Sequence, residues 1–208
     1  MVVTDIKSQK RTGFYSVFID GKYRFSLDSD TLNRAGLYRG DEIDESRIDD
    51  LLSKSAFARA REYGYLLLSY RDRSERELRN RLLQKDFDPG TVREVAGYFK
   101  REGLVDDRVF ARKWLDNTLA SRPMGRLRAR YELMKRGVSA GIVEEATAEI
   151  DLDMEYRLAR DAAGKKLRAL SGYPPDVARP RMLRFLRGRG FHFDVIHDLM
   201  EEYFGQDV

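Results

Sequence analysis

The alternation of hydrophobic and polar residues near the start of the chain predicts a β-hairpin. Residues 14–19 and 22–27 are rich in aromatic and β-branched side chains, and Asp20-Gly21 separates the two runs. This dipeptide favours a type I′ turn, in which both central residues have positive φ. An isolated hairpin is only marginally stable. We therefore expect it to pack on a neighbouring helix or to pair with another strand.

Two helices are expected to follow the hairpin. A short helix opens at Asp30 and should stop near Gly36, because glycine favours the left-handed conformation that ends many helices. A second helix should begin at about Glu45. Residues 1–58 are thus predicted to form a small N-terminal segment of hairpin and helices.

From Ala60 onward the hydrophobic pattern repeats, with offsets of 51 and then 53 residues. The offsets superimpose Leu82, Leu133 and Leu186, which we expect to occupy equivalent buried sites. The other matching columns are Leu78, Ala129 and Met182; Val92, Val143 and Ile196; Val95, Ala146 and Leu199; Tyr63, Trp114 and Leu167; and Ala60, Ala111 and Gly164.

Each repeat is interpreted as three helices. In the first repeat, Ser74 begins a helix with Glu77 three residues later, which is the capping-box spacing. That helix should end near Asp86, at a position where the later repeats have Gly137 and Gly190. The next helix should run from about Pro89 to Arg101, before Gly103.

The sequence therefore predicts a mainly α fold of tandem three-helix repeats. We expect repeats at residues 59–107, 108–153 and 154–208. Because a single unit of this size buries little apolar surface, the units should stack on one another into an elongated curved rod.

Charge adds a possible binding role. Residues 1–58 contain nine Lys/Arg and ten Asp/Glu, whereas residues 59–208 contain 30 and 25. Arginine outnumbers lysine 29 to 10, which suits a polyanion or an acidic protein face, since arginine pairs bidentately with phosphate and carboxylate. The alternative is local pairing of these arginines with neighbouring carboxylates on solvated helices.

The candidates for partner or DNA binding are six basic residues in the second and third repeats. They are Arg126, Arg128, Lys135, Arg181, Arg184 and Arg187. Arg128 and Arg181 are repeat equivalents, and both are expected to point away from the buried leucine face. For Lys85, Arg136 and Arg189, a favourable interaction with the helix dipole is the competing interpretation.

No pattern in the chain favours an enzyme, a cofactor or a metal site. His192 and His197 are the only histidines and stand five residues apart, which aligns them poorly on a helix. Asp106 and Asp107 are expected to cap a helix rather than to bind a cation. Tyr63, Trp114 and the phenylalanines at helical spacing are assigned to the core in preference to base stacking.

The absence of cysteine fits a reducing cytoplasm, and no apolar run approaches the roughly 20 residues of a membrane helix. The first ten residues do not have the pattern of a signal peptide. We therefore expect a cytoplasmic protein with no membrane association.

Three segments resemble the RecX regulatory proteins. They are LSYRDRSERELR at 68–79, GLVDDRVFA at 103–111, and RPMG at 122–125 followed by ELMKRGV at 132–138. The motif residues, interpreted as mainly structural, are Arg73, Ser74, Glu77, Leu78, Gly103, Leu104, Asp106, Asp107, Phe110, Gly125, Leu133 and Gly137. The chain departs from the family pattern at Asp86, where glycine is usual, and in the side chains of residues 127–129.

The resemblance implies a monomeric, non-enzymatic regulator that binds the RecA recombinase filament. It would inhibit RecA ATP hydrolysis, recombination and strand exchange, and so modulate DNA repair and the SOS response. Binding to single- or double-stranded DNA is expected to be weak, non-specific and sensitive to salt. The alternatives are a protein that binds DNA without RecA, and a helical scaffold for another protein.

Overall fold

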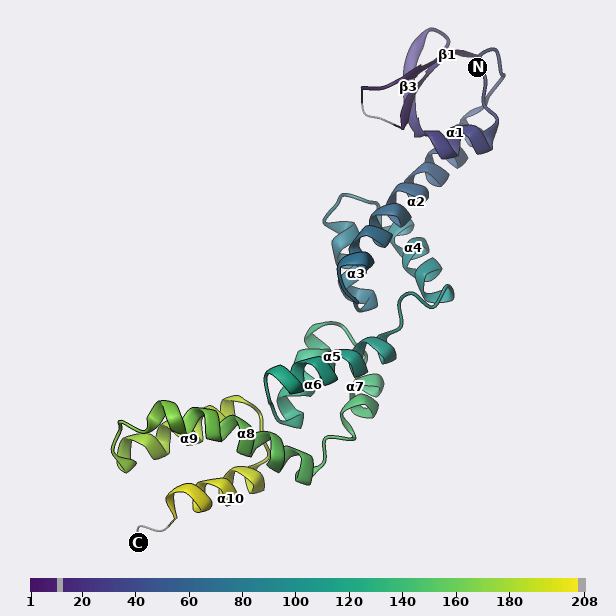
Figure 1. Cartoon of the computed structure of the whole chain (residues 1–208). Helices are drawn as coiled ribbons and strands as arrows, with labels where there is room; N and C mark the ends of the chain where they lie inside the picture. Colours follow the sequence, from purple (N-terminus) through teal and green to yellow (C-terminus); the bar gives the residue numbers. More distant parts are fainter. Residues whose placement is uncertain (11–12, 206–208) are drawn as a thin grey trace. The chain divides into compact units, whose positions relative to one another are not determined.

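A three-stranded antiparallel sheet forms the N-terminal part of the protein (Figure 1). The structure is a computed structural model and describes residues 1–10 and 13–205. The strands are β1 (Val3–Ser8), β2 (Phe14–Ile19) and β3 (Lys22–Asp28), in the order β1-β2-β3. Asp20 and Gly21 have φ of 48° and 76°, as a type I′ turn requires. The predicted hairpin is confirmed, and β1 is the additional strand with which it pairs.

The sheet buries one face against two helices. Helix α1 (Ser29–Ala35) is capped by the Asp28 carboxylate, which accepts a hydrogen bond from the Thr31 amide at 2.9 Å, and it ends at Gly36 with φ of 58°. Helix α2 (Glu45–Tyr70) is a single helix of 26 residues, and residues 58 and 59 both lie inside it. The core between these elements is formed by Val3, Val17, Ile19, Phe25, Leu27, Leu32, Leu37, Ile43, Ile48 and Leu51.

Ten helices are present in the part of the chain that the structure describes. The remaining ones are α3 (Glu75–Leu83), α4 (Pro89–Arg101), α5 (Asp107–Ser121), α6 (Arg126–Lys135), α7 (Ala140–Thr147), α8 (Leu152–Leu170), α9 (Pro175–Gly188) and α10 (Phe193–Phe204). The chain divides into two compact units: Met1–Asp72 with Leu78–Leu104, and Arg73–Glu77 with Val105–Val208. None of these helices is both long enough and apolar enough to cross a membrane.

The first unit contains α2, α4 and most of α3. Gly64 of α2 faces the ring of Phe99 on α4, where a Cβ atom would overlap the ring. This glycine therefore lets the two helices approach closely. Residues 84–86 form a turn after α3, and Asp86 adopts a φ of 63°. The aspartate thus ends its helix in the same left-handed conformation as Gly137 and Gly190, at 90° and 73°.

The second unit contains two helical triplets, α5–α7 and α8–α10, each with its own hydrophobic core. Leu133 and Leu186 are fully buried in these cores, as Leu82 is in the first unit. The prediction of equivalent buried leucines is confirmed. Together with the N-terminal sheet, these triplets confirm the predicted fold class of tandem three-helix repeats.

The repeat register predicted for the first helix of the third repeat is wrong. Gly164 is only half-buried, and it is the neighbouring Ala163 that is fully buried. Helix α9 has 14 residues and begins at Pro175, whereas α6 has ten and begins at Arg126. The offset of 53 residues therefore holds within the second helix of the repeat and fails before it.

Candidate partner-binding surface

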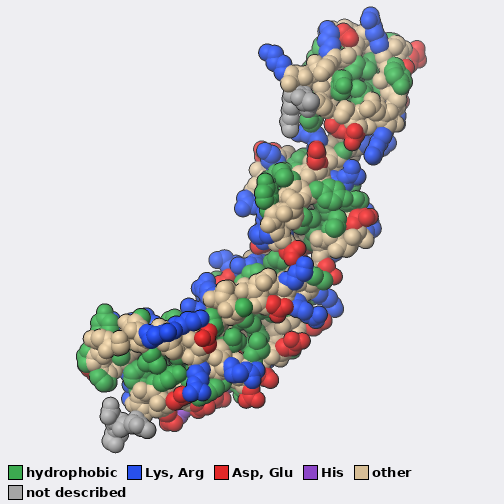
Figure 2. Space-filling view, in the orientation of Figure 1, with side chains coloured by type: hydrophobic (Ala, Val, Ile, Leu, Met, Phe, Trp, Pro, Cys, Tyr) green, Lys and Arg blue, Asp and Glu red, His purple; other side chains and the backbone are tan. Residues whose placement is uncertain are grey.

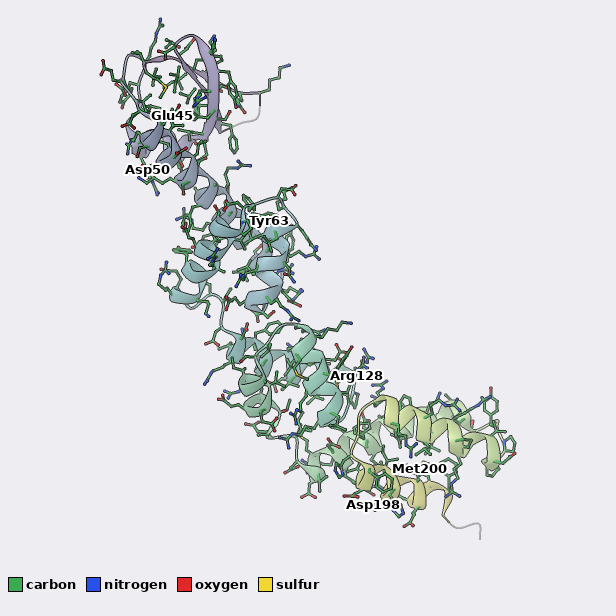
Figure 3. The ribbon with its side chains drawn as sticks, turned by 180° about the vertical axis from the view of Figure 1, so that it is seen from behind. Glu45, Asp50, Tyr63, Arg128, Asp198 and Met200 are labelled. Atoms are coloured by element: carbon green, nitrogen blue, oxygen red, sulfur yellow. The ribbon has the colours of Figure 1, made fainter. Side chains whose placement is uncertain are left out.

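The arginines of α6 are held by carboxylates of their own repeat. Glu132 accepts hydrogen bonds from Arg128 at 2.7 Å and from Arg136 at 2.9 Å. The bond from Arg136 lowers the pKa of Glu132, burial opposes that effect in part, and the bond from Arg128 adds to it. Arg128, labelled in Figure 3, is therefore not a free cation.

A second carboxylate pairs with the other two arginines of α6. Glu144 of α7 lies 2.7 Å from Arg126 and 2.8 Å from Arg130. Residues 122–136 contain only one acid, so the run appears strongly basic when it is considered alone. The fold brings Glu144 to it from outside that window. Local pairing, the alternative raised by the sequence, describes these positions.

The basic residues of α9 have a different environment. Arg184 and Arg187 are exposed and form no ion pair within the described part of the chain. Arg181 lies over the ring of Tyr173, 4.1 Å from its centroid, and it too forms no ion pair with a described carboxylate. We call Arg181, Arg184 and Arg187 the arginine row of α9. Lys135, the last residue of α6, is also exposed and has no ion pair among the described residues.

On the face shown in Figure 2, lysine and arginine side chains lie among aspartate and glutamate side chains. On this face the basic side chains are therefore largely interspersed with acidic ones. The arginine row of α9 differs because residues 179–189 contain no acid and no described carboxylate elsewhere in the chain forms an ion pair with these three arginines.

The cations at the ends of the second helices stack on aromatic rings. Arg136 lies 4.4 Å from the ring centroid of Trp114, and its repeat equivalent Lys85 lies 5.8 Å from that of Tyr63. Arg189 lies over Phe185 and donates a hydrogen bond to the Pro123 carbonyl at 2.8 Å; burial lowers its pKa. Tyr63 and Trp114 are half-buried, and the stacked cations help to cover them.

Several motif residues hold helix ends together. Ser74 caps α3 by accepting a hydrogen bond from the Glu77 amide at 3.2 Å, and its hydroxyl donates to the Arg136 carbonyl. Asp106 caps α5, and Asp107 accepts a hydrogen bond from the Glu75 amide at 2.8 Å. Gly125, the counterpart of Ser74, donates its amide to the Arg189 carbonyl at 3.0 Å.

The other motif residues have varied positions. Leu78 and Leu133 are fully buried, and Phe110 is nearly so. Gly103 has a φ of 68°, in the left-handed region. Leu104, by contrast, is about half exposed. Arg73 belongs to the short segment Arg73–Glu77 that packs with the second unit.

Glu155 of α8 is an important residue that the sequence analysis did not identify. It is buried, and its two carboxylate oxygens accept hydrogen bonds from the amides of Arg126 and His192, both at 2.7 Å. It thus joins the beginning of α6 to the beginning of α10. The available signal was its position four residues before Ala159 on the buried face of α8, since a carboxylate is rarely buried without partners.

The fold and this surface define a class: a tandem three-helix repeat protein with an N-terminal sheet. Its distinctive surface feature is a row of arginines that form no ion pair with the residues the structure describes. Four domain models of one family match the chain. The RecX first, second and third three-helix domains match residues 60–99, 106–146 and 153–200, and the regulatory protein RecX N-terminal domain matches residues 1–44. The chain belongs to the RecX family.

Relatives support this assignment along the whole chain. "Regulatory protein RecX" of Clostridium botulinum (strain Eklund 17B / Type B) is 28% identical over 203 residues, which cover 96% of this chain and 95% of the relative. That of Clostridioides difficile (strain 630) is 24% identical over 207 residues, 99% of this chain and 97% of the relative.

The fold also resembles solved structures. A crystal structure of regulatory protein RecX has a TM-score of 0.72 at 23% identity and covers 97% of this chain and 98% of its own. RecX from Lactobacillus salivarius has a TM-score of 0.62 at 18% identity and covers 72% of this chain and 97% of its own.

Proposed function

We propose that this protein is a non-enzymatic regulator that binds the RecA filament on DNA and inhibits RecA ATP hydrolysis and strand exchange. The proposal rests on membership of the RecX family, whose members regulate RecA. We further propose that it acts in the cytoplasm as a monomer. Its effect would follow from blocking access to the filament, from holding the filament in a less active state, or from favouring its disassembly.

The observation that carries the binding site is the arginine row of α9. Guanidinium groups without a carboxylate partner are available to phosphate or to acidic protein side chains. The arginines of α6 would first have to leave Glu132 or Glu144, which costs part of the energy gained. We therefore place the main polyanion contact on α9, with Arg128 as a minor contributor.

The test measures RecA ATP hydrolysis on single-stranded DNA with the parent protein and with an Arg184→Gln/Arg187→Gln variant. The parent should inhibit at a substoichiometric ratio, and the variant should require a higher concentration. Arg160→Gln is the matched control, because this exposed arginine of the same repeat is already paired with Glu202. Full inhibition by the folded double variant would show that the contact does not lie on the arginine row of α9. If the parent protein does not change RecA ATP hydrolysis, the proposed function is contradicted.

A salt titration of DNA binding without RecA separates phosphate contact from protein contact. The logarithm of the affinity should fall linearly with the logarithm of salt concentration, and removing two phosphate contacts should lower that slope by roughly two. A slope unchanged in the Arg184→Gln/Arg187→Gln variant would place these arginines against protein. Strong sequence preference that persists at high salt would favour a direct DNA-binding function instead.

A further inference from the structure

Helix α6 exposes a line of large apolar side chains. Leu127, Tyr131 and Met134 are 60%, 52% and 45% exposed. They stand at positions i, i+4 and i+7 of one helix, so they share one face. That face is exposed, whereas Ala129 and Leu133 lie on the buried face of the same helix. We call these three residues the apolar stripe of α6.

The fold of the repeat does not require this stripe. At the offset of 53 residues, the same positions of α9 are occupied by Pro180, Arg184 and Arg187. The third repeat nevertheless buries Met182 and Leu186 as completely as the second buries its own equivalents. In the first repeat, at the offset of 51 residues, these positions are Arg76, Asn80 and Leu83, of which Leu83 alone is apolar, and it is 42% exposed. A line of three exposed apolar side chains is therefore a property of the second repeat, independent of how the repeat packs. Apolar side chains that are exposed next to one another, without a packing role, mark a surface that another molecule can cover.

The apolar stripe of α6 is better suited to contact with a protein than with a nucleic acid. The arginines on either side of the stripe are paired with Glu132 and Glu144, so a phosphate group would have to compete with these carboxylates for them. Leu127 and Met134 provide neither charge nor a stacking plane for a base, and the Tyr131 ring already has the Arg128 guanidinium over it, 5.3 Å from the ring centroid. Burial of apolar side chains, by contrast, is the main favourable contribution in protein association.

Two basic residues that form no ion pair with the described part of the chain, Lys135 and Arg187, belong to the helix turns next to the two ends of the stripe. Lys135 follows Met134 directly and is exposed. At the other end, the Gly125 amide bonds the Arg189 carbonyl, and Gly190 packs against the backbone of Arg128. These contacts bring the last turn of α9, which carries Arg187, to the first turn of α6. A complementary surface is accordingly apolar at its centre and acidic at its edges.

We propose that the apolar stripe of α6 is the surface that docks this protein on a RecA protomer, against an apolar patch bordered by acidic side chains. The inference rests on the proposed function and assigns its protein contact to α6, separately from the polyanion contact on α9. Binding through α6 should depend weakly on salt, because its centre is apolar, whereas binding through α9 should weaken steeply with salt.

The experiment measures binding of the full chain to purified RecA without DNA, at low and at moderate salt. The variant is Leu127→Ser/Tyr131→Ser/Met134→Ser, and its fold is checked by circular dichroism and melting. Tyr70→Ser/Leu83→Ser is the matched control, because it removes exposed apolar groups that lie outside the stripe. We expect the triple variant to lose at least tenfold in RecA affinity at both salt concentrations, and to bind single-stranded DNA as the parent does.

Each outcome decides a separate point. If the parent binds RecA and the folded triple variant binds it equally well, the stripe is not the docking surface and the proposed function stands. If the triple variant and the Tyr70→Ser/Leu83→Ser control lose affinity equally, the loss is not specific to α6, and the inference fails. If the parent does not bind RecA, the proposed function fails and the inference fails with it. Where the triple variant does not fold, Tyr131→Ser alone is compared with Tyr70→Ser by the same criteria.

Discussion

Replacing Glu155 with alanine should loosen the connection between the second and third repeats. The carboxylate is 3% exposed and accepts two backbone hydrogen bonds, each of 2.7 Å, from Arg126 and His192. Arg126 is the first residue of α6, so its amide has no acceptor within its own helix. His192 precedes the first residue of α10, so its amide also lacks an intrahelical partner. The substitution therefore leaves two amides without their acceptor.

The size of the effect follows from the number and type of these bonds. A hydrogen bond to a charged group contributes about 1.5–3 kcal/mol. Two such bonds, partly replaced by water that enters the space left by the side chain, give an expected loss of about 3–5 kcal/mol for Glu155→Ala. Glu155→Gln should cost roughly 2 kcal/mol, because its oxygen keeps one bond while its NH₂ group faces the other amide.

The assay is urea unfolding followed by circular dichroism, together with hydrogen exchange of the two amides. Glu149→Ala is the control, because Glu149 is exposed and makes no ion pair among the described residues. The Arg126 amide should exchange at least about a hundredfold faster in Glu155→Ala, since 1.4 kcal/mol corresponds to a factor of ten. Equal unfolding midpoints for Glu155→Ala and Glu149→Ala, with unchanged exchange at Arg126, would refute this reasoning.

Three further tests, each with its own substitutions, address the core, the backbone and the charges. Leu133→Ala and Leu186→Ala should each cost about 2–5 kcal/mol in urea unfolding, because both side chains are fully buried; a loss in only one would break the repeat equivalence. Gly103→Ala should cost about 1 kcal/mol for its positive φ, whereas Gly190→Ala should cost several-fold more, because its Cβ would lie 2.5 Å from a backbone nitrogen; equal melting temperatures would contradict this. The folded-state pKa of Glu132 is lowered, so its contribution is present above its ordinary value of 4.5 and is lost as the pH falls through the lower folded value. The stability difference between the parent and Glu132→Gln should be about 0.5–1 kcal/mol at pH 7 and should vanish in acid; a difference that grows in acid would reverse this assignment.

The sequence predicted those parts of the fold that local chemistry determines. The Asp20-Gly21 turn, the stop at Gly36 and the buried leucine columns follow from turn preference, positive φ and helical period, which act over a few residues. Strand β1 was not identified, because its polar residues give no alternation as clear as that of β2. Its place depends on pairing with β2, which is a tertiary contact.

The candidate surface was harder to predict, because charge pairing depends on residues that are distant in sequence. Glu144 neutralises Arg126 across 18 residues and Glu155 bonds its amide across 29, so a count of charges in a short window misses both. The binding roles of Arg126, Arg128, Lys135 and the arginine row of α9 remain predictions. The fold adds a way to rank these residues as binding candidates, because some have a carboxylate partner among the described residues and others have none.

The proline at the beginning of α9 makes the third repeat differ from the first two in how it can bond to a following repeat. This difference matters when such an array is lengthened by duplicating a repeat. The first residues of α3 and α6, Glu75 and Arg126, each donate an amide to a carboxylate of the following repeat, Asp107 or Glu155. The first residue of α9 is Pro175, which has no amide hydrogen to donate. Duplicating the second repeat within a designed chain would reproduce a complete docking bond, whereas duplicating the third would place a proline where the donor belongs.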